Sequence, residues 1–133
     1  MKFRSMVAED FKEITKFWKE HYDISDRDDY EHIKYFLEKN AGFSTVAVDA
    51  ENKIVGTVLA SYDGRKGYIQ KMAVNKDLRG QGIGKKMLKN TLDKLKEAGA
   101  LDIRVNCSEK LIPFYRKCGF EIKNVTSMQI RNY

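Results

Sequence analysis

The chain has 133 residues, of which 42% are hydrophobic and 33% charged, and its formal net charge is +6 at pH 7. This length suits one domain, residues 1–133, that buries about two-thirds of the surface exposed by the unfolded chain. The sequence contains no apolar run of about 18 residues and no signal-peptide segment at its start, so it predicts a cytoplasmic protein with no membrane partner.

The first half of the chain predicts strands separated by two helices. Apolar residues at helical spacing indicate a helix from Glu9 to Tyr22, and a capping box at Ser25 and Asp28 indicates the start of a second one, whose apolar stripe ends at Leu37. Lys2–Met6 is a candidate for a short first strand. Two segments rich in Val, Thr and Ile, Phe43–Asp49 and Ile54–Tyr62, predict two strands that form a hairpin.

The second half predicts a strand, a long helix and further short elements. The strand Tyr68–Val74 runs into a glycine-rich stretch that opens a helix ending at Gly99. Alternating apolar and polar residues predict a strand over Leu101–Cys107. A short helix and two final strands are expected at Phe114–Lys117, Phe120–Lys123 and Thr126–Ile130. This order of elements indicates a mixed sheet with helices on both faces.

The glycine-rich stretch, residues 79–84, is suited to hold a phosphate group. Glycines at a helix start let the backbone approach a ligand, and the unpaired N–H groups there attract an anion. Lysine and arginine residues add positive charge around it, and basic residues outnumber acidic ones across residues 65–117. A Walker A loop is excluded because Arg79 stands where it needs a glycine. The dinucleotide fingerprint is excluded because Lys85 stands where it needs its third glycine.

Other classes of site find little support. Cys107 and Cys118 lack a CxxC spacing, and His21 and His32 form no ligand cluster, so we expect reduced thiols and no metal. Basic proteins often bind nucleic acid, but this chain has no nucleic-acid motif. A site for a small polyanion explains the local charge more simply, and no nucleic-acid partner is expected.

The spacing Arg79-x-x-Gly82-x-Gly84 after a strand resembles the pyrophosphate-binding motif of the GNAT family of N-acetyltransferases. Residues 114–120 (FYRKCGF) are similar to that family's aromatic–Tyr…Gly-Phe helix end, and the predicted element order is the family's order. The resemblance implies an α/β fold with a mixed, mostly antiparallel sheet of about seven strands and four helices on both faces. Residues 61–67 (SYDGRKG) further resemble a small bacterial branch with a Tyr-Asp-Gly hairpin and no assigned substrate.

The resemblance implies acetyl transfer from acetyl-CoA to a primary amine of a small molecule or peptide. Tyr115 would act as general acid toward the departing thiolate. Main-chain groups of the predicted strand would bind the pantetheine arm, and the glycine loop would bind the pyrophosphate. The residues implied in cofactor binding are Met72, Ala73, Val74, Arg79, Gly80, Gln81, Gly82, Ile83, Gly84, Lys85 and Ser108.

Three positions depart from the family pattern. Tyr68 and Gln70 stand where a Glu or His often acts as base, so the base is unassigned: water, a residue elsewhere or an amine that arrives neutral are the options. Ser108 replaces an asparagine; it can still cap a helix, but its pantetheine contacts are in question. Pro113 fits a first helical turn, so we expect the short helix to start later than is usual in the family.

The acidic run from Glu20 to Glu31, with Arg27 as its basic residue, favours a cationic acceptor, although carboxylates also gather at helix starts for the sake of the helix dipole. Two other readings remain open: a CoA-binding sensor without catalysis, and a basic module that interacts with nucleic acid or protein. The oligomeric state is also open, with an isologous homodimer through edge strands as one arrangement.

Overall fold

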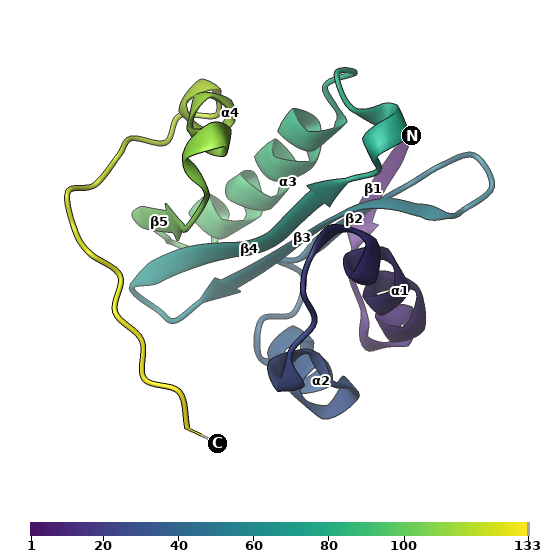
Figure 1. Ribbon diagram of the computed structural model, residues 1–133, viewed down its shortest axis with the longest axis horizontal. Coiled ribbons are helices and arrows are strands. Elements are labelled where there is room, and N and C mark those ends of the chain that lie inside the picture. The colour runs from purple at the N-terminus through teal and green to yellow at the C-terminus, as the bar shows by residue number, and fades with distance from the viewer. Residues whose placement is uncertain (133) are drawn as a thin grey trace.

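The computed structural model describes residues 1–132, which form one mixed sheet with helices on both faces (Figure 1). The strands are β1 (Lys2–Ser5), β2 (Thr45–Val48), β3 (Ile54–Tyr62), β4 (Lys66–Val74) and β5 (Asp102–Val105). The α-helices are α1 (Phe11–His21), α2 (Tyr30–Lys39), α3 (Ile83–Glu97) and α4 (Ile112–Lys117). The short 3-10 helices are η1 (Ala8–Asp10), η2 (Asp26–Asp28), η3 (Lys76–Leu78) and η4 (Glu109–Leu111).

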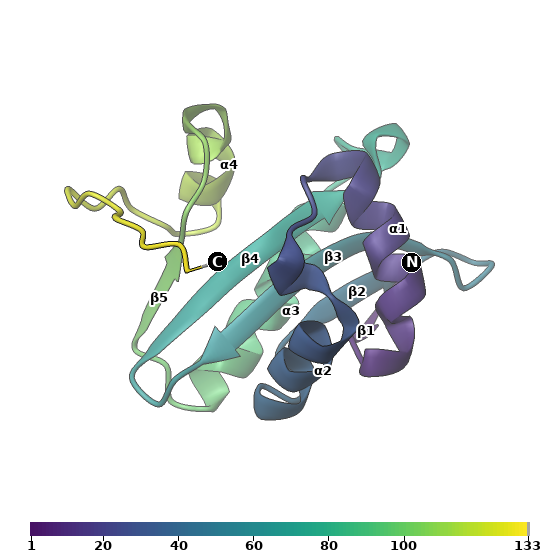
Figure 2. The ribbon, with the colours of Figure 1, turned by 60° about the horizontal axis from the view of Figure 1, so that its bottom comes forward.

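The sheet has the order β1-β2-β3-β4-β5, in which β5 is parallel to β4 and all other neighbours are antiparallel. Helices α1 and α2 cover one face, and α3 covers the other (Figure 2). Each face has its own buried cluster because side chains alternate along a strand. Trp18 and Ile14 of α1 lie in the first cluster, and Met87 and Leu88 of α3 lie in the second. Among the described residues, none of the helices combines the length and apolar content needed to cross a bilayer.

The prediction of about seven strands is wrong, because the sheet has five. Residues 120–132, which include the two predicted final strands, form neither helix nor strand. Beyond the half-buried Phe120 their large apolar side chains stay exposed: Ile122 is 60% and Ile130 is 96% accessible. Alternating apolar and polar residues form a strand only where a neighbouring strand edge can pair with them and their apolar face can be buried. In this structure β5 pairs with β4, and the last segment adds no strand beyond it.

Strands β4 and β5 diverge, and this divergence positions the candidate site. Their pairing joins Lys66–Ile69 to Asp102–Val105, after which β4 continues to Val74 without β5 beside it. On its other edge, β4 carries an irregularity opposite β3. Thr57 pairs with Ala73 and Leu59 with Gln70, so Lys71 and Met72 lie opposite one residue. Such a bulge locally bends a strand and re-aims its side chains.

Candidate functional site

The glycine cradle, residues 79–84, occupies the turn between η3 and α3. Gly82 is the N-cap of α3 with φ +80°, and Gly80 has φ +82°. Left-handed values of this kind favour glycine because a Cβ would approach the backbone. No side chain caps the helix, and the space beside Gly82 is open within 4 Å of where a Cβ would lie. The first-turn N–H groups of α3 are therefore available to an anion.

Gly84 has a different role from the glycines before it. A Cβ at this position would lie 3.2 Å from Met72 Cε, 3.4 Å from Val74 Cγ2 and 3.5 Å from Phe114 Cζ. Glycine thus lets the first turn of α3 lie against the end of β4 and against α4. This close approach places the cradle beside the end of β4, where the strand has no neighbour on its β5 side.

The cradle is electropositive and is tied to β4. The Arg79 Nε–H donates to the carbonyl oxygen of Val74 at 3.3 Å, which fixes the arginine beside the strand end. Lys89 is paired with Asp93 at 2.8 Å and contributes less free charge. The remaining lysines near the cradle are exposed: Lys76, Lys85 and Lys86. Several exposed cations around helix N–H groups favour a di- or polyphosphate ligand.

The unpaired edge of β4 brings main-chain donors and acceptors to the cradle. The residues predicted to bind through their main chain, Met72 to Val74, lie in this part of the strand. The Tyr22 hydroxyl donates to the Met72 carbonyl oxygen, and burial raises the pKa of Tyr22 while nearby Arg79 opposes that rise. The end of α1 therefore touches the strand at the predicted cofactor position. The sequence indicated Tyr22 only as part of an apolar stripe.

Tyr115 lies on α4, buried at 6% exposure between Phe114 and Phe120, whose ring centroids lie 5.1 and 5.5 Å from its own. Burial raises its pKa well above the ordinary value of 10.0, and Tyr22, Cys107 and Cys118 act in the same direction. Within residues 1–132 its hydroxyl has no hydrogen-bond partner. Tyr115 is thus a neutral phenol that keeps its proton, near the end of α1 and near the two cysteines.

The three departures from the family pattern have separate outcomes. Tyr68 is 39% exposed and Gln70 is exposed, and strand alternation puts both on the face opposite the buried Ile69. Ser108 takes the N-cap position of η4, but its side chain makes no capping hydrogen bond. Pro113 is the second residue of α4, which begins at Ile112, slightly earlier than the predicted Phe114.

Some carboxylates of the acidic run, residues 20–31, stabilise the fold by capping helices or by forming an ion pair. The capping box of Ser25 and Asp28 is confirmed, but it caps η2. The N-cap of α2 is Asp29, which accepts from the His32 N–H at 2.9 Å. Asp28 is also paired with Lys71, whose Nζ lies 3.3 Å from Asp28 Oδ2. The other carboxylates of the run are exposed: Glu20, Asp23, Asp26 and Glu31.

Sequence reasoning missed the contacts that join α1 to the bulge of β4. Trp18 Nε1–H donates to Thr57 Oγ1 at 2.9 Å, and the Thr57 hydroxyl donates to the Lys71 carbonyl oxygen at 2.9 Å. Lys71 itself has φ +50°, which is rare for a residue with a side chain. No local signal announces a bulge, so spacing alone had no means of finding Lys71.

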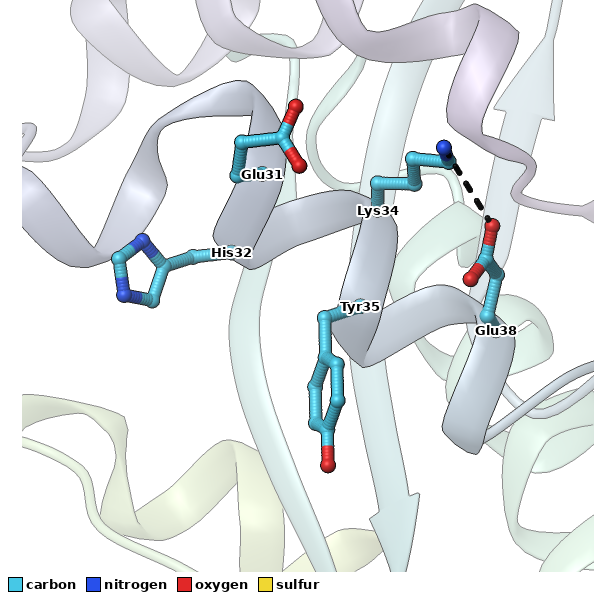
Figure 3. Close-up of a pocket in the computed structure, with 5 residues that line it drawn as sticks. All are labelled: Glu31, His32, Lys34, Tyr35 and Glu38. Carbon is cyan, nitrogen blue, oxygen red and sulfur yellow. Dashed lines mark ion pairs between the residues drawn. The ribbon is translucent and has the colours of Figure 1, made fainter.

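Two hollows lie away from the cradle. One, of about 380 Å³, is on the outer side of α2 and is lined by Glu31, His32, Lys34, Tyr35 and Glu38 (Figure 3). The other, of about 320 Å³, lies between Asp26, Arg27 and His32 on one side and residues 129–132 on the other. Neither is lined by a predicted cofactor or catalytic residue. Residues 1–132 also contain no group of three or more His, Cys, Asp or Glu residues that could hold a metal ion.

Comparisons with known proteins identify the family and the fold. The family model described as the acetyltransferase (GNAT) family matches residues 6–120. N-alpha-acetyltransferase 30 of Schizosaccharomyces pombe is 34% identical over 95 residues, which cover 65% of this chain and 63% of that protein. Glucosamine 6-phosphate N-acetyltransferase 1 of Oryza sativa subsp. japonica is 34% identical over 62 residues, covering 47% of this chain and 38% of that protein. The match thus spans less than two-thirds of either relative.

Among solved structures, a Clostridium acetobutylicum protein described as a predicted acetyltransferase with acetyl-CoA superposes with a TM-score of 0.72 at 23% identity. The superposition covers 97% of this chain and 95% of that one. At this identity the likeness concerns the fold.

Proposed function

Because this chain belongs to the acetyltransferase (GNAT) family, we propose that it transfers an acetyl group from acetyl-CoA to a primary amine. One observation carries the proposal. The second half of β4, which has no neighbour on its β5 side, leads through η3 to a helix start that is capped by glycine and surrounded by exposed cations. An extended chain of amides fits the free edge of β4, and a diphosphate at its end fits the glycine-capped start of α3. We take residues 1–133 as a single N-acetyltransferase domain.

The residues present fit acetyl-CoA by their chemistry. N–H groups of the cradle, from Gly80 to Lys85, would bind the diphosphate, and Arg79 would add charge. Main-chain groups of Met72, Ala73 and Val74 would hold the pantetheine amides, with Ser108 bordering the same region. When bound, acetyl-CoA supplies an activated acetyl group. Tyr115, whose side chain is buried and whose pKa is raised, would hold a proton on its hydroxyl, available to a thiolate that leaves beside it.

The acceptor amine must lose a proton, and the chain offers no evident base on β4. Tyr68 and Gln70 carry no group that accepts a proton at neutral pH. A water chain, a residue elsewhere or an amine that binds neutral would serve. The cationic acceptor remains our proposal for the substrate class. The exposed carboxylates Glu20, Asp23, Asp26 and Glu31 support it, and Asp28 does not, since Lys71 already neutralises it.

A second candidate function is CoA binding without catalysis. The missing base on β4 is the observation that favours it. This alternative predicts a rise in melting temperature with CoA and no release of free thiol from acetyl-CoA with any amine.

Two finer assignments are also proposals: that the chain belongs to a small bacterial branch with a Tyr-Asp-Gly hairpin, and that it forms a homodimer through the sheet edges β1 or β5. Light scattering of the purified protein tests the dimer.

The test of the proposed function is a screen of purified protein with acetyl-CoA against polyamines, lysine-containing peptides and neutral amino-acid amides. Release of CoA is measured at two ionic strengths. We expect turnover, with cationic amines preferred and their kcat/KM reduced by salt because the attraction is screened. Equal kcat/KM for cationic and neutral amines, without salt dependence, would contradict the cationic acceptor. CoA binding without thiol release from acetyl-CoA in the presence of any of these amines would support the second candidate.

A further inference from the structure

The side chain of Lys71 lies in a cage built by residues 18–28, a stretch that runs from α1 to η2 and is distant from β4 in the sequence. Its Nζ lies 3.3 Å from Asp28 Oδ2 and 3.4 Å from the Asp23 carbonyl oxygen. The same atom lies 5.3 Å from the ring centroid of Trp18 and 5.0 Å from that of Tyr22. The Lys71 and Asp28 side chains are only 16% and 10% exposed. An ammonium held by a carboxylate and two ring faces is fixed in position rather than free in solvent.

The backbone of the same residue is held as firmly as its side chain. The Lys71 carbonyl accepts from Thr57, which in turn accepts from the fully buried Trp18. The next carbonyl along β4, that of Met72, accepts from Tyr22. Lys71 thus connects the bulge of the proposed cofactor strand to the end of α1 and to η2. Figure 2 shows the segment between α1 and α2 passing over β4.

We propose that Lys71 is a positioning residue that holds the acidic segment Asp23–Asp28 against β4, so that the acceptor side and the cofactor side form as one unit. The inference rests on the proposed function, because it concerns the acceptor side of that same site. Its physical basis is the burial of the pair: when one member of a buried ion pair is removed, the other charge is left without compensation. The segment then moves toward solvent, while the cradle, which is built from backbone on the other side of β4, stays formed.

The first test follows the segment itself and needs no activity. Hydrogen exchange is measured by mass spectrometry over residues 22–29, where the Asp28 N–H donates to Ser25 O at 2.9 Å. We expect Lys71→Met to speed this exchange about tenfold or more, because local opening exposes these amides. Lys71→Arg, which keeps the charge, should stay within about threefold of the unchanged protein. Lys19→Met removes an exposed lysine of α1 and is the matched control.

A double-mutant cycle separates the pair from general loosening. Asp28→Asn removes the charge but keeps an oxygen for the Ser25 N–H, which donates to Asp28 Oδ2 at 3.1 Å. Lys71→Met, Asp28→Asn and the double variant should then give similar exchange rates, since each breaks the same interaction. Additive effects, or unchanged exchange in Lys71→Met, would overturn the proposal.

The second test uses the best amine from the screen above. For Lys71→Met we expect the KM of the amine to rise about tenfold or more, while the Kd of CoA stays within about threefold. A merely structural role would lower the melting temperature and leave KM unchanged in the folded protein, which would contradict positioning. If the unchanged protein turns over no amine, the proposed function fails, and the exchange experiment still decides the role of Lys71.

Discussion

The cradle and the Lys71 cage flank the same strand, yet the cradle consists of backbone groups and the cage mainly of side chains. The cradle is made of backbone: two left-handed glycines, the free N–H groups of α3 and a glycine that allows contact with β4. The cage is made mainly of side chains from the end of α1, from η2 and from β4. Two of its members, Asp28 and Lys71, are more than forty residues apart in the sequence. A backbone site depends on local conformation, whereas a side-chain site depends on how distant elements pack.

Tyr115 belongs to neither region and provides the largest expected effect. We expect Tyr115→Phe to lower kcat by about 10²–10⁴-fold, the usual contribution of a general acid, because it removes only the hydroxyl. The Kd of CoA should hardly change, since the ring and its contacts with Phe114 and Phe120 remain. Steady-state kinetics and a CoA titration measure both, and Tyr35→Phe on the exposed side of α2 is the control. Unchanged turnover would mean that the thiolate leaves without help from Tyr115.

The cradle is tested by placing charge where phosphate is expected. We expect the protein to bind CoA with a Kd in the micromolar range, about −8 kcal/mol. Gly82→Asp puts a carboxylate into the open space at the α3 start, which opposes an anion and should abolish most of the CoA-dependent rise in melting temperature. A full rise in this variant would contradict the cradle assignment.

A pair of alanine substitutions distinguishes two kinds of glycine within the cradle. Gly84→Ala brings a methyl group to within 3.2 Å of Met72 and should lower the free energy of unfolding by about 1–3 kcal/mol through overpacking. Gly82→Ala meets no atom within 4 Å and should cost about 1–2 kcal/mol, through its left-handed φ alone. Urea denaturation measures both. Met72→Leu removes the Met72 Cε atom that the new methyl group would approach, so it should alter the first cost and leave the second unchanged.

The contacts around the Lys71 cage are tested at Thr57, which is hydrogen-bonded both to Trp18 and to the bulge of β4. Thr57→Val keeps the shape but leaves the Trp18 N–H and the Lys71 carbonyl without their partner, so we expect a loss of about 1–3 kcal/mol in the free energy of unfolding. Thr57→Ser retains the hydroxyl and should lose less. A larger loss in Thr57→Ser than in Thr57→Val would show that the methyl packing, rather than the hydrogen bonds, holds α1 to β4.

The smallest expected effect is one of pH. Because the pKa of Tyr115 in the folded protein is raised above 10.0, its hydroxyl should stay protonated and kcat should show no fall from its ionisation between pH 8 and about 10. The sign for stability is the same: the contribution of the neutral phenol is fully present below pH 10 and is lost as the pH rises through the folded-state value. An alkaline decline in kcat below about pH 9 that disappears in Tyr115→Phe would contradict this assignment.

Local patterns were sufficient for most of the helices and for the hairpin. The helical spacing around Ile14 and Trp18, the Val-rich strands β2 and β3, and the glycines of the cradle each report on a few neighbouring residues. The pattern failed where a strand needs a neighbour, because residues 120–132 alternate like a strand but add none to the sheet. The capping box was found at the right residues and assigned to the wrong helix, since both η2 and α2 begin within a few residues.

The sequence by itself therefore determined the family, the element order up to α4 and the glycine-rich start of α3, because these follow from spacing and from glycine conformations that are local. Only the tertiary structure decided that β4 and β5 separate after Ile69, that a bulge turns Lys71 toward Asp28, and that Tyr22 reaches the Met72 carbonyl. The physical reason is one of range: backbone conformation is set by adjacent residues, whereas an ion pair between α1–α2 and β4 exists only once the two layers have packed.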